Sequence, residues 1–118
     1  MTTSPEQLRT RTKEFALRII RRYKTLPTAG EGQVIGKQLL RCGTSVGANY
    51  RAACRSRSRA EFAAKIGIVV EEADESMYWM ELLIEAGTVN AEKMAELQKE
   101  AKELAAIFTA SRQTARGK

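Results

Sequence analysis

The sequence predicts an all-α protein that folds as an up-and-down four-helix bundle. Apolar residues recur at spacings of three and four in four successive segments, which is the period of a helix with one buried face. Short turn-like segments separate them, and helices joined by short turns pack as antiparallel neighbours. The 118 residues, 43% of them hydrophobic, suffice for a single domain, residues 1–118, with one core. The expected helices span residues 5–25, 33–54, 59–86 and 91–112.

The first helix, residues 5–25, has a clear start signal. Ser4 is a good N-cap, Pro5 suits the first turn, and Gln7 completes a capping box. Pro27 ends the segment. The predicted inner face consists of Leu8, Thr12, Phe15, Ile19, Tyr23 and Leu26.

The second helix, residues 33–54, contains small residues within its apolar seam. Gly43 and Gly47 cost helix propensity but let another backbone approach, so we predict a tight helix crossing there. We expect Asn49 to donate to a backbone group or hydroxyl across the bundle, and Ser45 and Asn49 to be structural polar residues rather than ligands. The predicted seam is Ile35, Leu39, Cys42, Val46, Asn49 and Ala53.

The third helix, residues 59–86, begins with a capping box at Ser58 and Glu61, and Gly87 suits a left-handed C-terminal cap. At 100° per residue its core face consists of Phe62, Ile66, Val69, Val70, Ala73, Met77, Met80 and Ile84.

A second, narrower apolar set lies roughly opposite that face and consists of Ile68, Trp79 and Leu82. Two interpretations stay open: scattered surface apolar residues, which are common, or a contact with another subunit. Trp79 favours the subunit contact, because large aromatic side chains are enriched in interface cores.

The fourth helix, residues 91–112, follows Asn90, which can cap it. Its predicted inner face consists of Met94, Leu97, Ala101, Leu104, Phe108 and Ser111.

Charge is unevenly distributed along the chain. Residues 1–59 hold thirteen Lys or Arg against three Glu, for a net charge of +10, whereas residues 60–118 hold seven against eleven acids, for a net charge of −4. The basic half suits a polyanion, but it equally suits the acidic half of a neighbouring copy.

Two groups of arginines stand out within the basic half. One lies along a flank of the first helix, and the other occupies residues 51–59, where there is no acid. Both groups fit either a solvated surface or a phosphate-binding surface. No aromatic residue lies among them, so a bound nucleic acid is contacted mainly through its backbone. The candidate residues are Arg11, Arg18, Arg22, Arg51, Arg55, Arg57 and Arg59.

The residues for catalysis or metal binding are sparse. The chain has no histidine, and Cys42 and Cys54 lack a zinc-like spacing, so both thiols are expected to be small apolar groups. The acidic cluster at residues 71–75 is not on the predicted inward face, as a carboxylate metal site in a bundle requires. We therefore predict a protein that is not an enzyme and has neither metal nor cofactor. No signal peptide or long apolar run is evident, which predicts no membrane association and a cytoplasmic location.

Residues 41–83 carry a family resemblance. They resemble the bacterial four helix bundle protein family, first noticed as reading frames inside intervening sequences of large-subunit ribosomal RNA genes. The family usually has an acid three residues beyond the asparagine, where this chain has Ala52. The matching residues are Ser45, Val46, Asn49, Ser58, Arg59, Glu61, Phe62 and the segment 72–83 with Trp79.

The resemblance implies a ring-like homo-oligomer, a homopentamer, and no enzymatic activity. For one relative it also implies an accessory role beside a reverse transcriptase in diversity-generating retroelements, with a basic surface that holds nucleic acid. The leading hypothesis is thus a homo-oligomeric scaffold whose arginines bind RNA or DNA phosphates. The rival hypothesis is a protein–protein assembly module with no nucleic-acid role.

Overall fold

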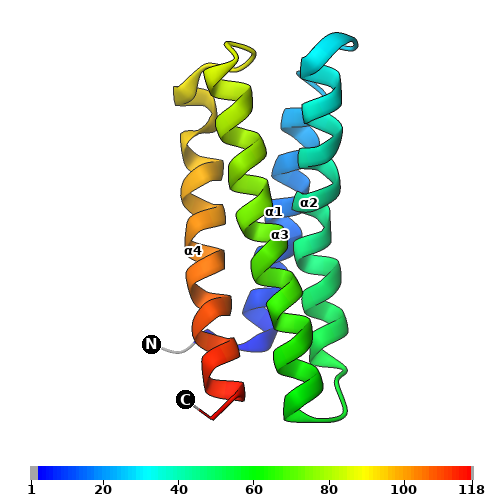
Figure 1. The fold of residues 1–118 in the computed structure, drawn as a ribbon, viewed down its shortest axis with the longest axis vertical. Helices are drawn as coiled ribbons and strands as arrows, with labels where there is room; N and C mark the ends of the chain where they lie inside the picture. The colour runs from blue at the N-terminus through cyan, green and yellow to red at the C-terminus, as the bar shows by residue number, and fades with distance from the viewer. Residues whose placement is uncertain (1–2, 118) are drawn as a thin grey trace.

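The computed structural model describes residues 3–117, so residues 1, 2 and 118 of the predicted domain lie outside it. Four antiparallel helices run up and down in the order α1 (Pro5–Tyr23), α2 (Gly30–Cys54), α3 (Arg59–Glu85) and α4 (Ala91–Ala115) (Figure 1). The bundle measures 44 × 25 × 22 Å. Over residues 3–117 all the regular structure is helical, which confirms the predicted fold class. No helix in this range is both long and apolar enough to span a membrane.

The predicted caps are present at three helix starts. Ser4 and Gln7 form the reciprocal capping box of α1, with N–H···O distances of 2.9 and 3.1 Å. The Ser58 hydroxyl accepts from the Glu61 N–H, and the Asn90 side chain accepts from the Glu92 N–H, both at 3.0 Å. These side chains satisfy N–H groups that have no partner inside the helix.

Each helix differs from its predicted bounds at one end. α1 ends at Tyr23 rather than residue 25, and α3 ends at Glu85 rather than residue 86. α2 begins at Gly30 rather than residue 33, because Gly30, with a φ of +77°, turns the chain directly into the helix. No side chain caps this helix start.

α4 continues to Ala115 rather than residue 112. There the Thr114 carbonyl accepts from the Gly117 N–H and from the Arg59 guanidinium, each at 3.0 Å, and the second bond links α3 to the end of α4.

The core faces of α1 and α4 are largely those that the sequence predicts, but the predicted Tyr23 and Ser111 are only half-buried. In α1 the buried side chains include Leu8, Phe15 and Ile19, and the hydroxyl of buried Thr12 donates to the Leu8 carbonyl at 2.8 Å. In α4 the buried residues are Met94, Leu97, Ala101, Leu104, Ala105 and Phe108.

The predicted core face of α3 is wrong in part. Four of the predicted residues are only half-buried, and Ser76 and Leu83 are in the core instead. The half-buried residues are Phe62, Val70, Met77 and Ile84. The central buried positions advance by three and four in strict alternation, a seven-residue repeat that drifts about 20° per heptad from a straight 100° wheel. Supercoiling therefore moves the core face along the helix. These positions are Ile66, Val69, Ala73, Ser76, Met80 and Leu83.

In α2 the position predicted for Asn49 in the seam is taken by its neighbour. Tyr50 is buried and its ring lies 5.0 Å from the ring of Phe108, between centroids. Asn49 is half-buried and its amide donates at 2.9 Å to the Ser45 carbonyl of its own helix. The expectation of a hydrogen bond across the bundle is therefore wrong, because the amide finds its acceptor one turn back.

α1 and α2 approach closely through small residues, as predicted. A Cβ added at Gly43 would lie 2.8 Å from Cγ1 of Ile19, and one at Gly47 would lie 3.2 Å from Oγ1 of Thr12. α1 makes far fewer contacts with α4 than with α2. The bundle is thus closed tightly along α1–α2, α2–α3 and α3–α4, and more loosely along α1–α4.

This packing predicts opposite effects for two glycine substitutions. Gly43→Ala forces apart a fully buried Ile19, an overpacking cost of about 1–3 kcal/mol against a helix-propensity gain of about 1 kcal/mol, so the free energy of unfolding should fall by up to ~2 kcal/mol. Gly67→Ala meets only the exposed Arg112 side chain, at 3.3 Å, and should raise that free energy by up to ~1 kcal/mol. Urea denaturation measures both. A Gly43→Ala protein more stable than the wild type would contradict the close approach of α1 and α2.

Candidate nucleic-acid interface

An arginine of α1 forms an ion-pair cluster that bridges the α1–α4 seam. Arg11 donates to both carboxylate oxygens of Glu100 and to Glu103, each at 2.8 Å. The hydrogen bond with Glu100 is the largest of the effects that raise the pKa of Arg11. Such forked pairing is among the stronger charge-assisted contacts. Arg11, a predicted nucleic-acid residue, is therefore already neutralised within the chain.

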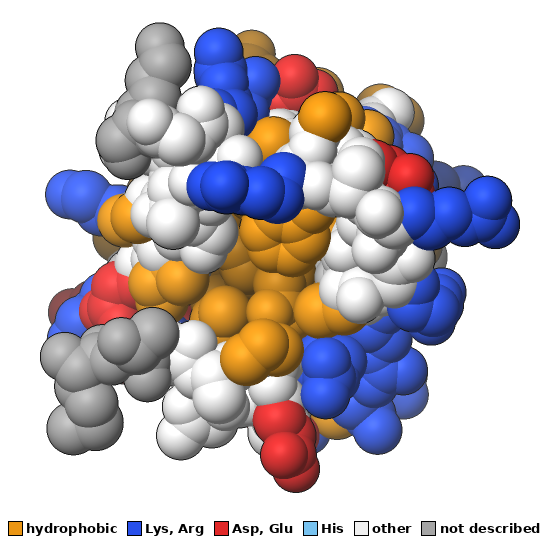
Figure 2. Space-filling view, turned by 90° about the horizontal axis from the view of Figure 1, so that it is seen from below, with side chains coloured by type: hydrophobic (Ala, Val, Ile, Leu, Met, Phe, Trp, Pro, Cys, Tyr) orange, Lys and Arg blue, Asp and Glu red, His pale blue; other side chains and the backbone are white. Residues whose placement is uncertain are grey.

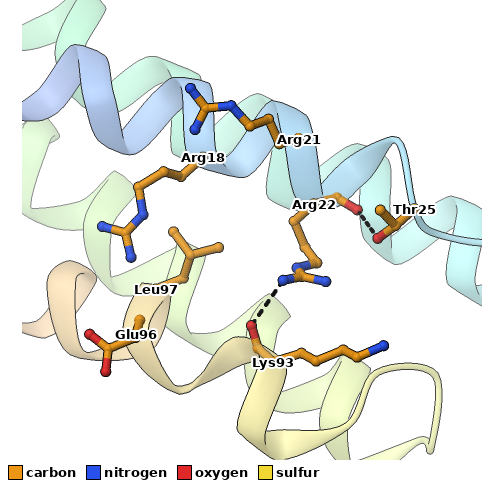
Figure 3. Close-up of a pocket in the computed structure, with 7 residues that line it drawn as sticks. All are labelled: Arg18, Arg21, Arg22, Thr25, Lys93, Glu96 and Leu97. Atoms are coloured by element: carbon orange, nitrogen blue, oxygen red, sulfur yellow. Dashed lines mark hydrogen bonds between the residues drawn. The ribbon is translucent and has the colours of Figure 1, made fainter.

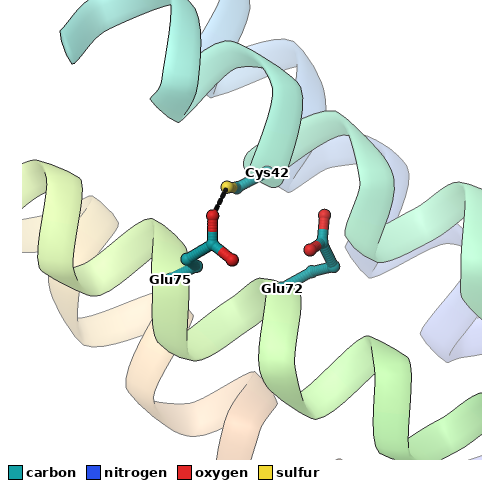
Figure 4. Close-up of side chains that lie close together, drawn as sticks. All are labelled: Cys42, Glu72 and Glu75. Atoms are coloured by element: carbon teal, nitrogen blue, oxygen red, sulfur yellow. Dashed lines mark hydrogen bonds between the residues drawn. The ribbon is translucent and has the colours of Figure 1, made fainter.

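A second ionic cluster bridges the α2–α3 seam (Figure 4). Arg41 contacts Glu75 at 2.6 Å and Glu72 at 3.5 Å. The Cys42 thiol donates to Glu75 at 3.0 Å, and the Trp79 indole N–H lies 3.4 Å from the same oxygen. These hydrogen bonds, that from Cys42 foremost, and the Arg41 charge lower the pKa of Glu75.

The ligand atoms of Cys42, Glu72 and Glu75 lie within 4.8 Å of one another, close enough for a metal ion. Their chemistry argues against that use. Burial, followed by the hydrogen bond to Glu75, raises the pKa of Cys42 to about 12, so the thiol stays protonated at neutral pH. Arg41 already supplies the positive charge. We interpret the cluster as a structural link between helices that the sequence did not reveal.

The basic residues between α1 and α2 have a different environment. Arg9, Lys13 and Arg51 line one groove of about 320 Å³, over a floor that includes Ala16 and Gly47. No carboxylate lines this groove, and none of the three cations forms an ion pair within residues 3–117. Clustered cations without counter-charges attract an anion. We call this site the α1–α2 groove.

The remaining arginines of residues 51–59 lie at the foot of the bundle, the end with both termini and the α2–α3 turn. Arg55 and Arg57 are exposed and form no ion pair within the described residues. Arg59 reaches α4 through its bond to Thr114 and lines a hollow of about 580 Å³ with Leu8, Phe62 and Ile107. From below, apolar side chains floor the hollow and basic ones lie at several places around it (Figure 2).

Arg18 and Arg22 lie on the α4 flank of α1, like Arg11, but further along the seam. They line a groove of about 450 Å³, together with Lys93 and a single carboxylate, Glu96. We call this site the α1–α4 groove. The seven predicted arginines therefore do not form one surface. They divide between the α1–α2 groove, the foot and the α1–α4 seam.

The predicted interface residues of α3 also separate. Ile68 is 44% exposed, whereas Trp79 and Leu82 are half-buried. Tyr78, next to Trp79 and at the edge of the same apolar set, is 53% exposed. The outer ridge of α3 is formed by the exposed residues Ala64, Ile68, Glu71, Asp74, Tyr78 and Glu81.

Sequence reasoning identified Arg51 but not its two partners in the α1–α2 groove. Arg9 and Lys13 are four residues apart, so they share one side of α1, and that side faces away from Arg11. This spacing was a usable signal. The sequence does not show which residue of another helix lies beside Arg9 and Lys13. Only the packing of α2 against α1 shows that this neighbour is Arg51.

Fold and surface together define a small helical bundle with a basic groove on one side and ionic seams on two others. The sequence matches the model of the family described as 23S rRNA-intervening sequence protein over residues 7–110, and the chain belongs to that family. The family resemblance drawn from residues 41–83 is thus confirmed.

A solved structure supports the same assignment. It is a protein of unknown function from the S23 ribosomal protein family of Bacteroides thetaiotaomicron VPI-5482. It is 34% identical, with a TM-score of 0.83, and the similarity covers 92% of this chain and 97% of that one. No curated protein matches the sequence.

The Arg11 cluster predicts a measurable coupling across the α1–α4 seam. In a double-mutant cycle of Arg11→Gln and Glu100→Gln, the coupling free energy should be about 1 kcal/mol, because the pair is forked and partly shielded, with side chains 31% and 16% exposed. The matched cycle with Glu96→Gln, one turn away and outside the cluster, should give about zero. Equal coupling in the two cycles, measured by urea denaturation, would show that the contact is not specific.

Proposed function

We propose that this protein binds the phosphate backbone of RNA or DNA through the α1–α2 groove and the adjoining arginines of the foot, and that it acts without catalysis. One observation carries the proposal: Arg9, Lys13 and Arg51 share a groove that contains no carboxylate. Their mutual repulsion is relieved when an anion lies between them. Arg55 and Arg57 extend this unpaired charge towards the foot.

The composition of the groove supports backbone contacts rather than base recognition. Its other lining residues are Thr12, Ala16, Thr44, Gly47 and Ala48, none of them aromatic. Without a stacking platform, and with cations as the main polar groups, sequence preference should be weak. Arg11 is left out of the proposed surface because Glu100 and Glu103 already bind it.

The family membership gives the proposal a setting. The family is described by a ribosomal RNA intervening sequence, which is consistent with a protein that works beside nucleic acid in the cytoplasm. As part of the same proposal, the chain assembles as a ring-like homopentamer, which would repeat the basic surface around the ring. An accessory role beside a reverse transcriptase fits such a scaffold, because the scaffold would supply a basic surface that holds the template nucleic acid for the enzyme.

The proposal predicts salt-dependent binding that depends on the α1–α2 groove. Binding of labelled duplex DNA should weaken with a log–log salt slope of about −0.9 per neutralised phosphate, and the same test applies to RNA. Lys13→Gln with Arg51→Gln should make that slope shallower by about 2. Lys99→Gln with Lys102→Gln removes the same charge from exposed positions of α4 and should leave the slope unchanged.

Two outcomes would overturn the proposal. One is the absence of binding to either nucleic acid at low salt in a filter or anisotropy titration. The other is an equal loss in both double variants, because net charge rather than the groove would then explain the binding.

An assembly module is the second candidate, and the α3 ridge favours it. Ile68 and Tyr78 are exposed there beside Glu71, Asp74 and Glu81, which combines apolar area with negative charge. Such a ridge is complementary to a basic groove on a neighbouring copy. In this alternative the α1–α2 groove, together with Arg55 and Arg57 of the foot, binds protein carboxylates instead of phosphates.

Charge reversal at the foot separates the two candidates. Under the nucleic-acid proposal, Arg55→Glu with Arg57→Glu should leave the oligomer intact by light scattering and strongly weaken nucleic-acid binding, since both side chains are exposed. Loss of the oligomer by the same variant would support the assembly module and count against the nucleic-acid role.

A further inference from the structure

The α1–α4 groove holds cations that neither the core nor the ion-pair clusters explain. Arg18, Arg21, Arg22 and Lys93 line it with Thr25, Leu97 and one carboxylate, Glu96. None of the four cations forms an ion pair within the part of the chain that the structure describes. Arg11 on the same flank shows what a satisfied arginine looks like, with three charged hydrogen bonds. Compared with Arg11, the cations of this groove have more hydrogen-bond donors than the groove has acceptors for them.

Arg22 shows the shortage of acceptors most clearly. One of its terminal nitrogens donates to the Lys93 carbonyl at 3.1 Å. Its Nε is buried from solvent and has no hydrogen-bond partner among residues 3–117. A buried donor without an acceptor is destabilising, and such groups call for an explanation. A guanidinium has five N–H groups, so most of the donors of Arg22 remain for a ligand.

Arg18 and Arg22 are four residues apart on α1, so they share the side of the helix that faces α4. Arg18 and Arg22 both extend from α1 towards α4 and lie on either side of Leu97 (Figure 3). Arg22 meets α4 in its first turn, where the N-terminal end of a 25-residue helix carries partial positive charge. Arg21 and Arg22 interact favourably with the C-terminal end of the α1 helix dipole, because they lie in its last turn. This interaction accounts neither for the presence of Arg18 in the groove nor for the unpaired Nε of Arg22.

We propose that the α1–α4 groove binds a single phosphate group, with Arg18 and Arg22 as its charged ligands. The groove differs from the α1–α2 groove because Glu96 lies at its side. The Glu96 carboxylate repels an extended polyanion that runs along the whole groove. A single phosphate is small enough to contact the arginines without contacting Glu96. Arginine suits this task because its planar fork matches phosphate oxygens. The source of the phosphate is either a free phosphate or the terminal phosphate of a nucleic acid.

Titration calorimetry with inorganic phosphate tests the site directly. The wild-type protein should show saturable binding of one phosphate per chain. Arg18→Gln and Arg22→Gln should each weaken the affinity by about tenfold or more, the loss expected for a charged hydrogen bond. Arg18→Gln leaves the bond of Arg22 to Lys93 in place, so it remains informative if Arg22→Gln unfolds the protein. Lys99→Gln removes the same charge from an exposed position of α4 outside both grooves and should change phosphate affinity less than about twofold.

Competition then identifies the source. If the ligand is a terminal phosphate, a short 5′-phosphorylated oligonucleotide should displace inorganic phosphate while its 5′-hydroxyl counterpart does not. If the ligand is free phosphate, neither oligonucleotide should displace it, and the site still stands.

The absence of saturable phosphate binding, or an equal loss in Arg18→Gln and Lys99→Gln, would overturn the proposal. These results are separable from the test of the α1–α2 groove. There Lys13 and Arg51 are changed, and the readout is the salt dependence of polynucleotide binding.

Discussion

The close approach of α1 and α2 is the constraint on which the rest of this structure depends. Gly43 and Gly47 have no side chains, so Ile19 and Thr12 of α1 pack directly on the α2 backbone. The short distance between the helices brings Arg51 to the same groove as Arg9 and Lys13. A larger residue in place of Gly47 would fill the floor of that groove as well as push the helices apart. The packing that stabilises the core therefore also sets the shape of the basic site.

The uneven distribution of charge along the chain acquires a structural meaning in the folded bundle. The basic half forms α1 and α2, and the acidic half forms α3 and α4. The halves meet along two seams, where Arg11 binds Glu100 and Glu103, and Arg41 binds Glu72 and Glu75. Opposite charges can pair only along those seams. The α1–α2 groove lies inside the basic half, which is why its cations have no carboxylate.

Sequence reasoning succeeded where a feature depends on neighbours along the chain and failed where it depends on neighbours in space. The caps at Ser4 and Asn90 and most of the core faces of α1 and α4 are local patterns, and these were predictable. The core face of α3 was displaced because supercoiling, a property of the whole bundle, shifts a straight helical wheel. The different environments of Arg11 and Arg18 were also beyond the sequence. Both lie on one flank of α1, and only the axial register of α4 decides which one meets carboxylates.

α1 shows how one helix can present basic side chains to different anions. Towards α2, Arg9 and Lys13 face a groove without acids, which suits an extended chain of phosphates. Towards α4, Arg11 is neutralised by two glutamates, whereas Arg18 and Arg22 share their groove with only one. The chemistry of each arginine is thus set by the helix opposite it. A count of basic residues predicts that this surface attracts anions, but the acids across each seam decide which anion fits.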